Sequence, residues 1–459
     1  MFFPFFIAQA PPPVEIVRPQ EVRVLPGQLD QIPVFNSNSP EKVLGEGILL
    51  STFPATGKTH PDAHLDFPFS GRFDLFAHHV AQGSPEDLRS LHIGAIAYNP
   101  SDQPVTLYFL NGASYLSQPD APFIALDPQV PNPRGNVYAG PGSRVMDNLL
   151  RRRLQEQFPK QLTIAPQSYQ MIFDLPIPVR ELEPPLNGRS TYLELNSTGP
   201  VYVASLALFE KPDGQGDFRP PTLAEWQALL ETGELSSPRD RPPSVPGAPG
   251  GLIYGRVAGV SEGSTWKTQI YDSPTWDLTI PAPGEAFSYG ISTLVGGTHG
   301  TGQIQTAEML RRYPDTAYAA HGNYGVLYDL TLPLHNPTEA TQTVAIALET
   351  PIKQDATDEA LRFFDPLPTA TFFRGPVRVN YKDDTGRLRT DYFHLVQKRG
   401  QAGEPLVTLE MPPGDRRLVN IQLRYPPDAT PPQVLTVKTQ SDNMNNLGKK
   451  NHSSRLSKW

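Results

Sequence analysis

One stretch of the sequence occurs twice, and a repeat constrains the fold strongly because each copy is expected to form a similar unit. Residues 140–152 (GPGSRVMDNLLRR) align with residues 300–312 (GTGQIQTAEMLRR) in one register. After a gap the alignment resumes, and residues 169–178 align with residues 324–333. In each copy a Gly-x-Gly turn precedes a helical pattern, and an extended apolar run follows it. The repeat predicts an internal duplication of the chain.

Three short helices are predicted. Two belong to the repeated stretch and span residues 145–157 and 306–313. The third spans residues 222–235, where Thr222 and Glu225 have the spacing of a capping box.

The remaining pattern predicts strands. Proline is excluded from helix interiors and tolerated at strand edges and turns, and 52 of the 459 residues are proline. Apolar runs at residues 91–98 and 105–110 flank an Asn-Pro turn, and the same arrangement returns at residues 328–334 and 344–348. Later hairpins with Pro-rich turns follow each pair and could supply a second sheet. We therefore expect a mostly β chain of two antiparallel β-sandwich units, related by the internal duplication, with a few short helices.

Changes in composition divide the chain into six predicted segments. These are a signal-peptide remnant (1–10), a Pro-rich arm (11–40), a β-sandwich unit with helices (41–235), a Pro/Gly linker (236–251), a second β-sandwich unit (252–438) and a disordered tail (439–459).

The first ten residues carry information about the cellular compartment of the protein. An apolar run ends in Ala8-Gln9-Ala10, the small-x-small spacing of a signal-peptidase site. No charged residue precedes the run and Pro11 follows it, so an apolar N-terminus on a cytoplasmic protein is the alternative. We expect a periplasmic or secreted protein.

Composition excludes several classes of function. The chain has no cysteine, which excludes disulfides, thiolate metal sites and a cysteine nucleophile. The net charge of −8 argues against a nucleic-acid partner, because such proteins need a basic face. No apolar run of the length that spans a bilayer is present, so we expect no transmembrane segment.

Several blocks resemble a known family. They include YAGPGSRVMDNLLRR, PIPVRELEPPLNGRSTYLEL, IYGRVAGVSEGSTW and YPPDATPPQVLTV. The family that they resemble consists of exported cyanobacterial proteins known only as a domain of unknown function, and the resemblance runs from about residue 20 to about residue 438. It implies a cyanobacterial, exported, Pro-rich protein, and it carries no activity and no catalytic residues.

A glycine-rich segment is one candidate ligand site. Thr298, His299, Gly300 and Gly302 precede the predicted second-copy helix, whose free amides and dipole could hold an anion. The corresponding segment of the first copy has Pro141 and no histidine, which favours a tight turn without a ligand.

A cluster of His and Asp is the candidate metal site. His60, His64 and Asp66 are potential ligands, and alternate residues of a strand, such as His64 and Asp66, share one face. Pro61 argues against a helix here, and a solvated loop is the alternative interpretation.

Aromatic residues crowd the second copy. Trp276 and Tyr324 are candidate ligand-binding residues, because exposed rings stack on sugar faces and are common in protein interfaces. The alternative is that such rings fill the core.

These observations lead to two candidate functions. Neither a GxSxG nor an HExxH motif occurs, and we expect no cofactor. We favour an exported, non-catalytic envelope protein that binds an envelope polysaccharide, peptidoglycan or an envelope protein. A carbohydrate-active hydrolase of the cell envelope is the alternative, because its two carboxylates are defined by their spacing in the fold.

Overall fold

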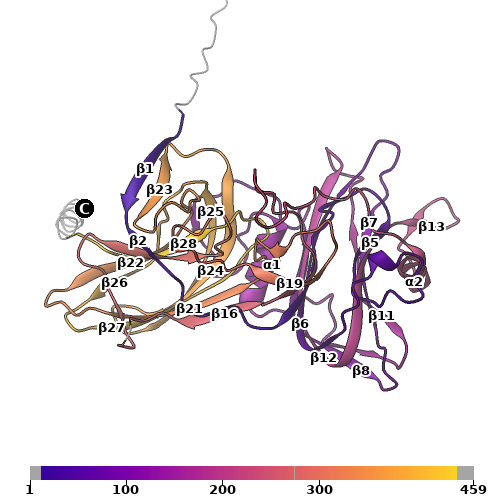
Figure 1. Cartoon of the computed structure of the whole chain (residues 1–459), viewed down its shortest axis with the longest axis horizontal. Helices are drawn as coiled ribbons and strands as arrows, with labels where there is room; N and C mark the ends of the chain where they lie inside the picture. The colour runs from indigo at the N-terminus through magenta and orange to yellow at the C-terminus, as the bar shows by residue number, and fades with distance from the viewer. Residues whose placement is uncertain (1–11, 273, 442–459) are drawn as a thin grey trace, which may run out of the picture.

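The computed structural model describes residues 12–272 and 274–441 of the chain (Figure 1). Within these residues strands β1 to β28 dominate, accompanied by helix α1 (Pro141–Leu150), helix α2 (Leu223–Thr232) and the 3-10 helix η1 (Pro61–Ala63). The prediction of a mostly β chain is confirmed. The predicted signal-peptide remnant, residues 1–10, and residues 442–459 of the predicted tail lie outside the described residues.

The N-terminal half is built around one long strand, β12 (Leu186–Phe209). The first part of β12 pairs with β6 (Phe69–Gln82) and β8 (Val105–Leu116), and its second part pairs with β5 (Gly47–Ser51) and β7 (Leu91–Tyr98). Between the two parts the register with β6 shifts. Gly199 lies at this shift, where an added Cβ would stand 2.8 Å from the Val105 side chain. Apolar residues of both parts share one hydrophobic cluster, which we call the N-terminal core.

The C-terminal half has two sheets with a shared core. One sheet runs through β16 (Thr265–Gln269), β21 (Leu327–His335), β27 (Arg416–Arg424), β24 (Thr371–Lys382), β25 (Leu388–Lys398) and β9 (Gln129–Pro131). The other runs through β2 (Glu21–Arg23), β18 (Ala286–Ile291), β28 (Gln433–Thr439), β22 (Gln342–Glu349) and β26 (Pro405–Met411). Leu330 and Val379 of the first sheet and Ile346 and Leu435 of the second belong to one hydrophobic cluster, the C-terminal core.

Strands from distant parts of the sequence join the two halves. β3 (Pro33–Ser37) lies between β6 and β15 (Ala258–Glu262), and β15 pairs in turn with β19 (Ala307–Arg312). The sheet of the N-terminal half therefore includes strands from both sides of residues 236–251, and the predicted division of the chain there stays a prediction. The figure shows the purple N-terminal strands beside the orange C-terminal strands, with α1 and β19 where they meet (Figure 1).

The remaining strands are short or lie at edges. They are β1 (Val14–Pro19), β4 (Lys42–Val43), β10 (Gln161–Ile164), β11 (Tyr169–Ile177), β13 (Lys211–Pro212), β14 (Phe218–Arg219), β17 (Leu278–Thr279), β20 (Ala319–Ala320) and β23 (Ala360–Asp365).

The predicted helices have different outcomes. Helix α2 is confirmed together with its capping box, in which the Thr222 side chain accepts from the Glu225 amide. Helix α1 begins at Pro141 and ends at Leu150, earlier than the predicted residues 145–157.

The predicted helix at residues 306–313 is wrong, because these residues form strand β19. The reason is tertiary pairing. The backbone of β19 pairs with β15, and just before it the buried Gln305 side chain accepts from the Ser292 amide and donates to the Gly290 carbonyl. These contacts hold the segment extended, and they override the helical pattern of its side chains. The repeated stretches thus form a helix in one copy and a strand in the other, and the internal duplication is not shown.

Candidate functional site

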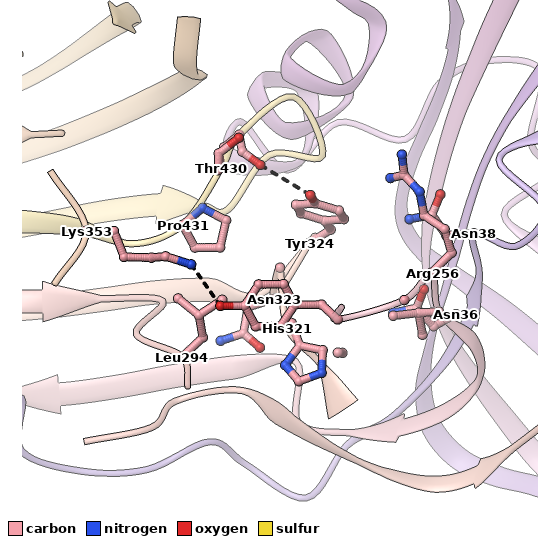
Figure 2. Close-up of a pocket in the computed structure, with 16 residues that line it drawn as sticks. Asn36, Asn38, Arg256, Leu294, His321, Asn323, Tyr324, Lys353, Thr430 and Pro431 are labelled. Atoms are coloured by element: carbon pink, nitrogen blue, oxygen red, sulfur yellow. Dashed lines mark hydrogen bonds between the residues drawn. The ribbon is translucent and has the colours of Figure 1, made fainter. Parts of the chain in front are cut away.

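A cavity of about 190 Å³, lined by both polar and apolar residues, lies where the two halves meet (Figure 2). Its walls come from β3, from the segment that leads into β15, from the loop before β21 and from the loop between β27 and β28. The described residues that line this pocket are Asn36, Asn38, Tyr254, Gly255, Arg256, Val257, Leu294, Ala320, His321, Gly322, Asn323, Tyr324, Lys353, Ala429, Thr430 and Pro431.

Two asparagines form one wall. Asn36 lies in β3 and Asn38 follows it two residues later, so that both side chains leave the strand on the same face. Asn36 is 4% exposed and Asn38 is 3% exposed, yet the Oδ1 atom of each has no hydrogen-bond partner among the described residues. An unpaired buried acceptor costs about 1–3 kcal/mol, so buried polar groups are rarely left this way without a reason. The wall therefore holds two buried amide oxygens that the described chain leaves unpaired.

A lysine, a tyrosine and a histidine form another part of the lining. The Lys353 ammonium donates to the Tyr254 hydroxyl over 2.8 Å, and that hydroxyl donates to the Val295 carbonyl over 2.6 Å. The His321 ring lies 4.9 Å from the Tyr254 ring, and its buried Nδ1 has no partner among the described residues. Burial, together with the charge of Lys353, lowers the pKa of His321 to about 4, so that the imidazole is neutral near pH 7.

Tyr324 and Arg256 complete the polar lining. The Tyr324 hydroxyl donates to the Ala429 carbonyl over 3.2 Å, and burial raises the pKa of this phenol to about 12. Arg256 forms an ion pair with Glu41, which lies outside the lining. Tyr324 is thus the one sequence-predicted ligand residue that lines this pocket.

The predicted site at residues 298–302 lies elsewhere and leads into a strand, not a helix. The amide and hydroxyl of Thr298 both donate to the Asp355 carboxylate, over 2.7 and 2.8 Å. The chain's own carboxylate therefore occupies the donors that would hold an anion. An added Cβ at Gly300 would stand 2.1 Å from the backbone carbon of Thr357, whereas Gly302 has open space around it.

His299 of the same loop is fully buried. Its backbone amide donates to the Gln354 carbonyl over 2.8 Å, and its φ of 52° is in the left-handed region. Neither ring nitrogen has a partner among the described residues. Burial lowers the pKa of His299 to about 4, and the Asp355 charge opposes the shift.

Trp276 is highly exposed, at 71%. Its ring lies 4.9 Å from the ring of Tyr271, which is also exposed. This aromatic pair does not line the pocket, and it presents a separate surface where a sugar or a protein could stack.

The predicted metal residues are not brought together. His60 is exposed at the start of η1, whereas His64 is buried and its Nδ1 lies 2.8 Å from the Ser51 hydroxyl. Burial, aided by the charge of Lys58, lowers the pKa of His64 to about 4. Asp66 has a φ of 49°. In the described part of the chain, no group of three or more His, Asp or Glu side chains could hold a metal ion.

Sequence reasoning did not identify most of the pocket. Asn36, Asn38, Tyr254, His321 and Lys353 belong to no motif and are spread over more than 300 positions. Only the fold shows that they converge, because the strand pairing of β3 with β15 brings two of these segments together.

The fold and the pocket define a mostly β, cysteine-free protein with a small pocket at the junction of its two halves. Residues 20–439 match the model of a family described as a protein of unknown function, DUF3370, and the chain belongs to this family. No curated protein shows a significant match. The resemblance to a domain of unknown function is thereby confirmed, and the cyanobacterial origin stays a prediction. Among the described residues no helix is long and apolar enough to cross a membrane.

Proposed function

We propose that the protein is an exported, non-catalytic envelope protein, and that its junction pocket binds one sugar ring of an envelope polysaccharide or of peptidoglycan. The observation that carries the proposal is the pair of buried, unpaired amide oxygens of Asn36 and Asn38. An asparagine amide can accept from one hydroxyl and donate to a neighbouring one, and adjacent hydroxyls are what a sugar ring offers.

The size and the aromatic lining support a sugar. The cavity of about 190 Å³ corresponds to roughly six water molecules at ~30 Å³ each, which is room for a single ring. The rings of Tyr254, His321 and Tyr324 line the pocket and would offer apolar surface to the C–H faces of such a ring.

The architecture that we infer is two β-sandwich units that share this pocket at their junction. Support comes from the N-terminal and C-terminal cores, each of which gathers side chains from two layers of strands. Export is supported by the absence of cysteine and by the small-x-small pattern near the start of the sequence.

Binding is favoured over hydrolysis because the pocket offers no acid and base pair. Glycoside hydrolysis uses two carboxyl groups on either side of the bond that breaks. No Asp or Glu is among the described residues of the lining. The two carboxylates that act electrostatically on Tyr324 are engaged within the chain, because Glu41 is ion-paired with Arg256 and Asp428 accepts from the Ser143 amide.

Co-sedimentation with insoluble glycan tests the proposal. The full chain should pellet with isolated peptidoglycan or with extracted envelope polysaccharide, and soluble fragments of that glycan should compete. The double variant Asn36→Leu, Asn38→Leu should stay in the supernatant, whereas Asn136→Leu, a change at an exposed asparagine, should pellet like the wild type.

Two outcomes would contradict the proposal. If the double variant pellets as fully as the wild type, the glycan binds elsewhere, and the exposed Trp276 surface becomes the next candidate. If the wild-type protein stays in the supernatant with both materials, glycan binding is wrong and a protein partner should be sought by cross-linking.

A further inference from the structure

The charge of the pocket differs in sign from that of the chain. The whole sequence carries a net charge of −8, but the described residues of the lining include the cations Arg256 and Lys353 and no carboxylate. A ligand with a negative group would therefore face no carboxylate among the described lining residues.

The two cations are not equivalent. The charge of Arg256 is balanced by its ion pair with Glu41. Lys353 lies within 4.0 Å of no carboxylate of the described chain, and its one side-chain hydrogen bond goes to the Tyr254 hydroxyl. An ammonium has three N–H donors, so two of them are left for a ligand.

Lys353 lies opposite the asparagine wall, which is formed by Asn36 and Asn38 (Figure 2). In the view of Figure 2, Lys353 lies on one side of the pocket and Asn36 and Asn38 on the other. A sugar ring bound between them would place its hydroxyls against the two asparagine amides. The opposite edge of the ring would face the Lys353 ammonium. Lys353 is exposed, so that edge would lie at the mouth of the pocket.

We propose that the bound ring is an acidic sugar, and that Lys353 receives its carboxylate; this inference rests on the proposed function. A carboxylate at the position of the exocyclic carbon, as in a uronic acid, would accept a charge-assisted hydrogen bond from the free N–H donors of Lys353. The same hydroxyls would still bind Asn36 and Asn38.

Matched pairs of methyl glycosides test this inference. Methyl glucuronide differs from methyl glucoside only in a carboxylate that replaces the hydroxymethyl group, and the galacturonide and mannuronide pairs cover the neighbouring stereochemistries. Titration of the full chain by calorimetry or ligand-observed NMR should show about tenfold tighter binding of the acidic member of at least one pair. Added salt should reduce the preference, because the ammonium is exposed.

Substitutions test whether Lys353 causes the preference for the acidic sugar. Lys353→Gln should bind the acidic and the neutral member of that pair equally, within about twofold. Lys267→Gln, at an exposed lysine of β16, should keep the preference. Equal binding of both members by the wild type, or an unchanged preference in Lys353→Gln, would overturn the inference while the glycan proposal stands. Failure of every pair to bind would overturn this inference, while the glycan proposal would still be decided by co-sedimentation. Binding of a short glutamate peptide in their place would identify an acidic protein segment as the ligand.

Discussion

The junction pocket and the loop at residues 298–302 both contain buried polar groups, but the two places differ in whether those groups are hydrogen-bonded within the chain. In the loop, the Thr298 amide and hydroxyl are bound by the chain's own Asp355. In the pocket, the amide oxygens of Asn36 and Asn38 are buried and left without a partner. A polar group that the chain pairs by itself contributes to stability, whereas a buried one left unpaired lowers stability. The contrast distinguishes a loop whose polar groups are paired within the chain from a pocket whose amide oxygens are not, and substitutions at the two places test it.

Replacing Gly300 by Ala should have the largest effect. Its φ of 82° disfavours a side chain, and an added Cβ would stand 2.1 Å from the Thr357 backbone. Strain and overpacking together should lower the free energy of unfolding by about 3 kcal/mol or more. Urea unfolding measures this, with Gly302→Ala as the matched control, because Gly302 has a similar φ of 70° and open space. Equal stability of the two variants would show that the loop is not packed as described.

The pH dependence of stability tests the burial of His299. Its pKa is lowered to about 4 in the folded chain, against about 6.5 when unfolded. Below about pH 6.5 the unfolded state binds more protons at this residue, so stability falls as the pH falls and stops falling near pH 4. One such group contributes a loss of up to about 1.4 kcal/mol for each pH unit.

His299→Asn should therefore flatten this dependence, and asparagine tolerates the left-handed backbone at this position. Urea unfolding between pH 4 and 7 measures the slope for the wild type, for this variant and for the matched control His60→Asn in an exposed loop. A slope that does not change in His299→Asn would mean that the ring is open to protons in the folded chain.

Replacing Asp355 by Ala should have a moderate effect on stability and none on glycan binding. The change removes two hydrogen bonds to Thr298, but Asp355 is exposed, so the loss should be only about 1 kcal/mol. Urea unfolding and glycan co-sedimentation of the same protein measure both properties, and Asp358→Ala, at a nearby exposed aspartate, is the control. Loss of glycan binding at full stability would place the ligand at this loop and not in the pocket.

Local features of the fold could be predicted from the sequence. The strand at residues 91–98 was bounded correctly, and the capping box of Thr222 and Glu225 identified α2. Both signals lie within a few residues of the element that they specify. The helical pattern at residues 306–313 failed because its outcome depends on β15 and on the side-chain contacts of Gln305, which no local pattern records.

The candidate site was less predictable than the fold. Tyr324 was identified because it lies in an aromatic-rich stretch, and it does line the pocket. Asn36 and Lys353 were missed, since a single asparagine or lysine in a sequence carries no signal until the fold shows what it faces. The conspicuous Gly-Thr-His-Gly stretch instead marks a loop that pairs its polar backbone and hydroxyl donors within the chain.

The smallest predicted change in stability belongs to the asparagine wall, and it distinguishes the two regions most sharply. The amide oxygens of Asn36 and Asn38 are buried and unpaired. Asn36→Leu and Asn38→Leu each replace such an amide with an apolar side chain of similar size. Because no internal hydrogen bond is lost and the cost of burying the amide is removed, the free energy of unfolding should stay within about 0.5 kcal/mol of the wild type or rise. Urea unfolding of both variants, next to Asp355→Ala, makes the comparison on one scale. If either leucine variant loses about 2 kcal/mol or more, its amide is paired inside the folded chain, and the argument that the pocket keeps it free for a sugar is wrong. If stability holds while glycan binding is lost, these two amides serve a ligand and not the fold.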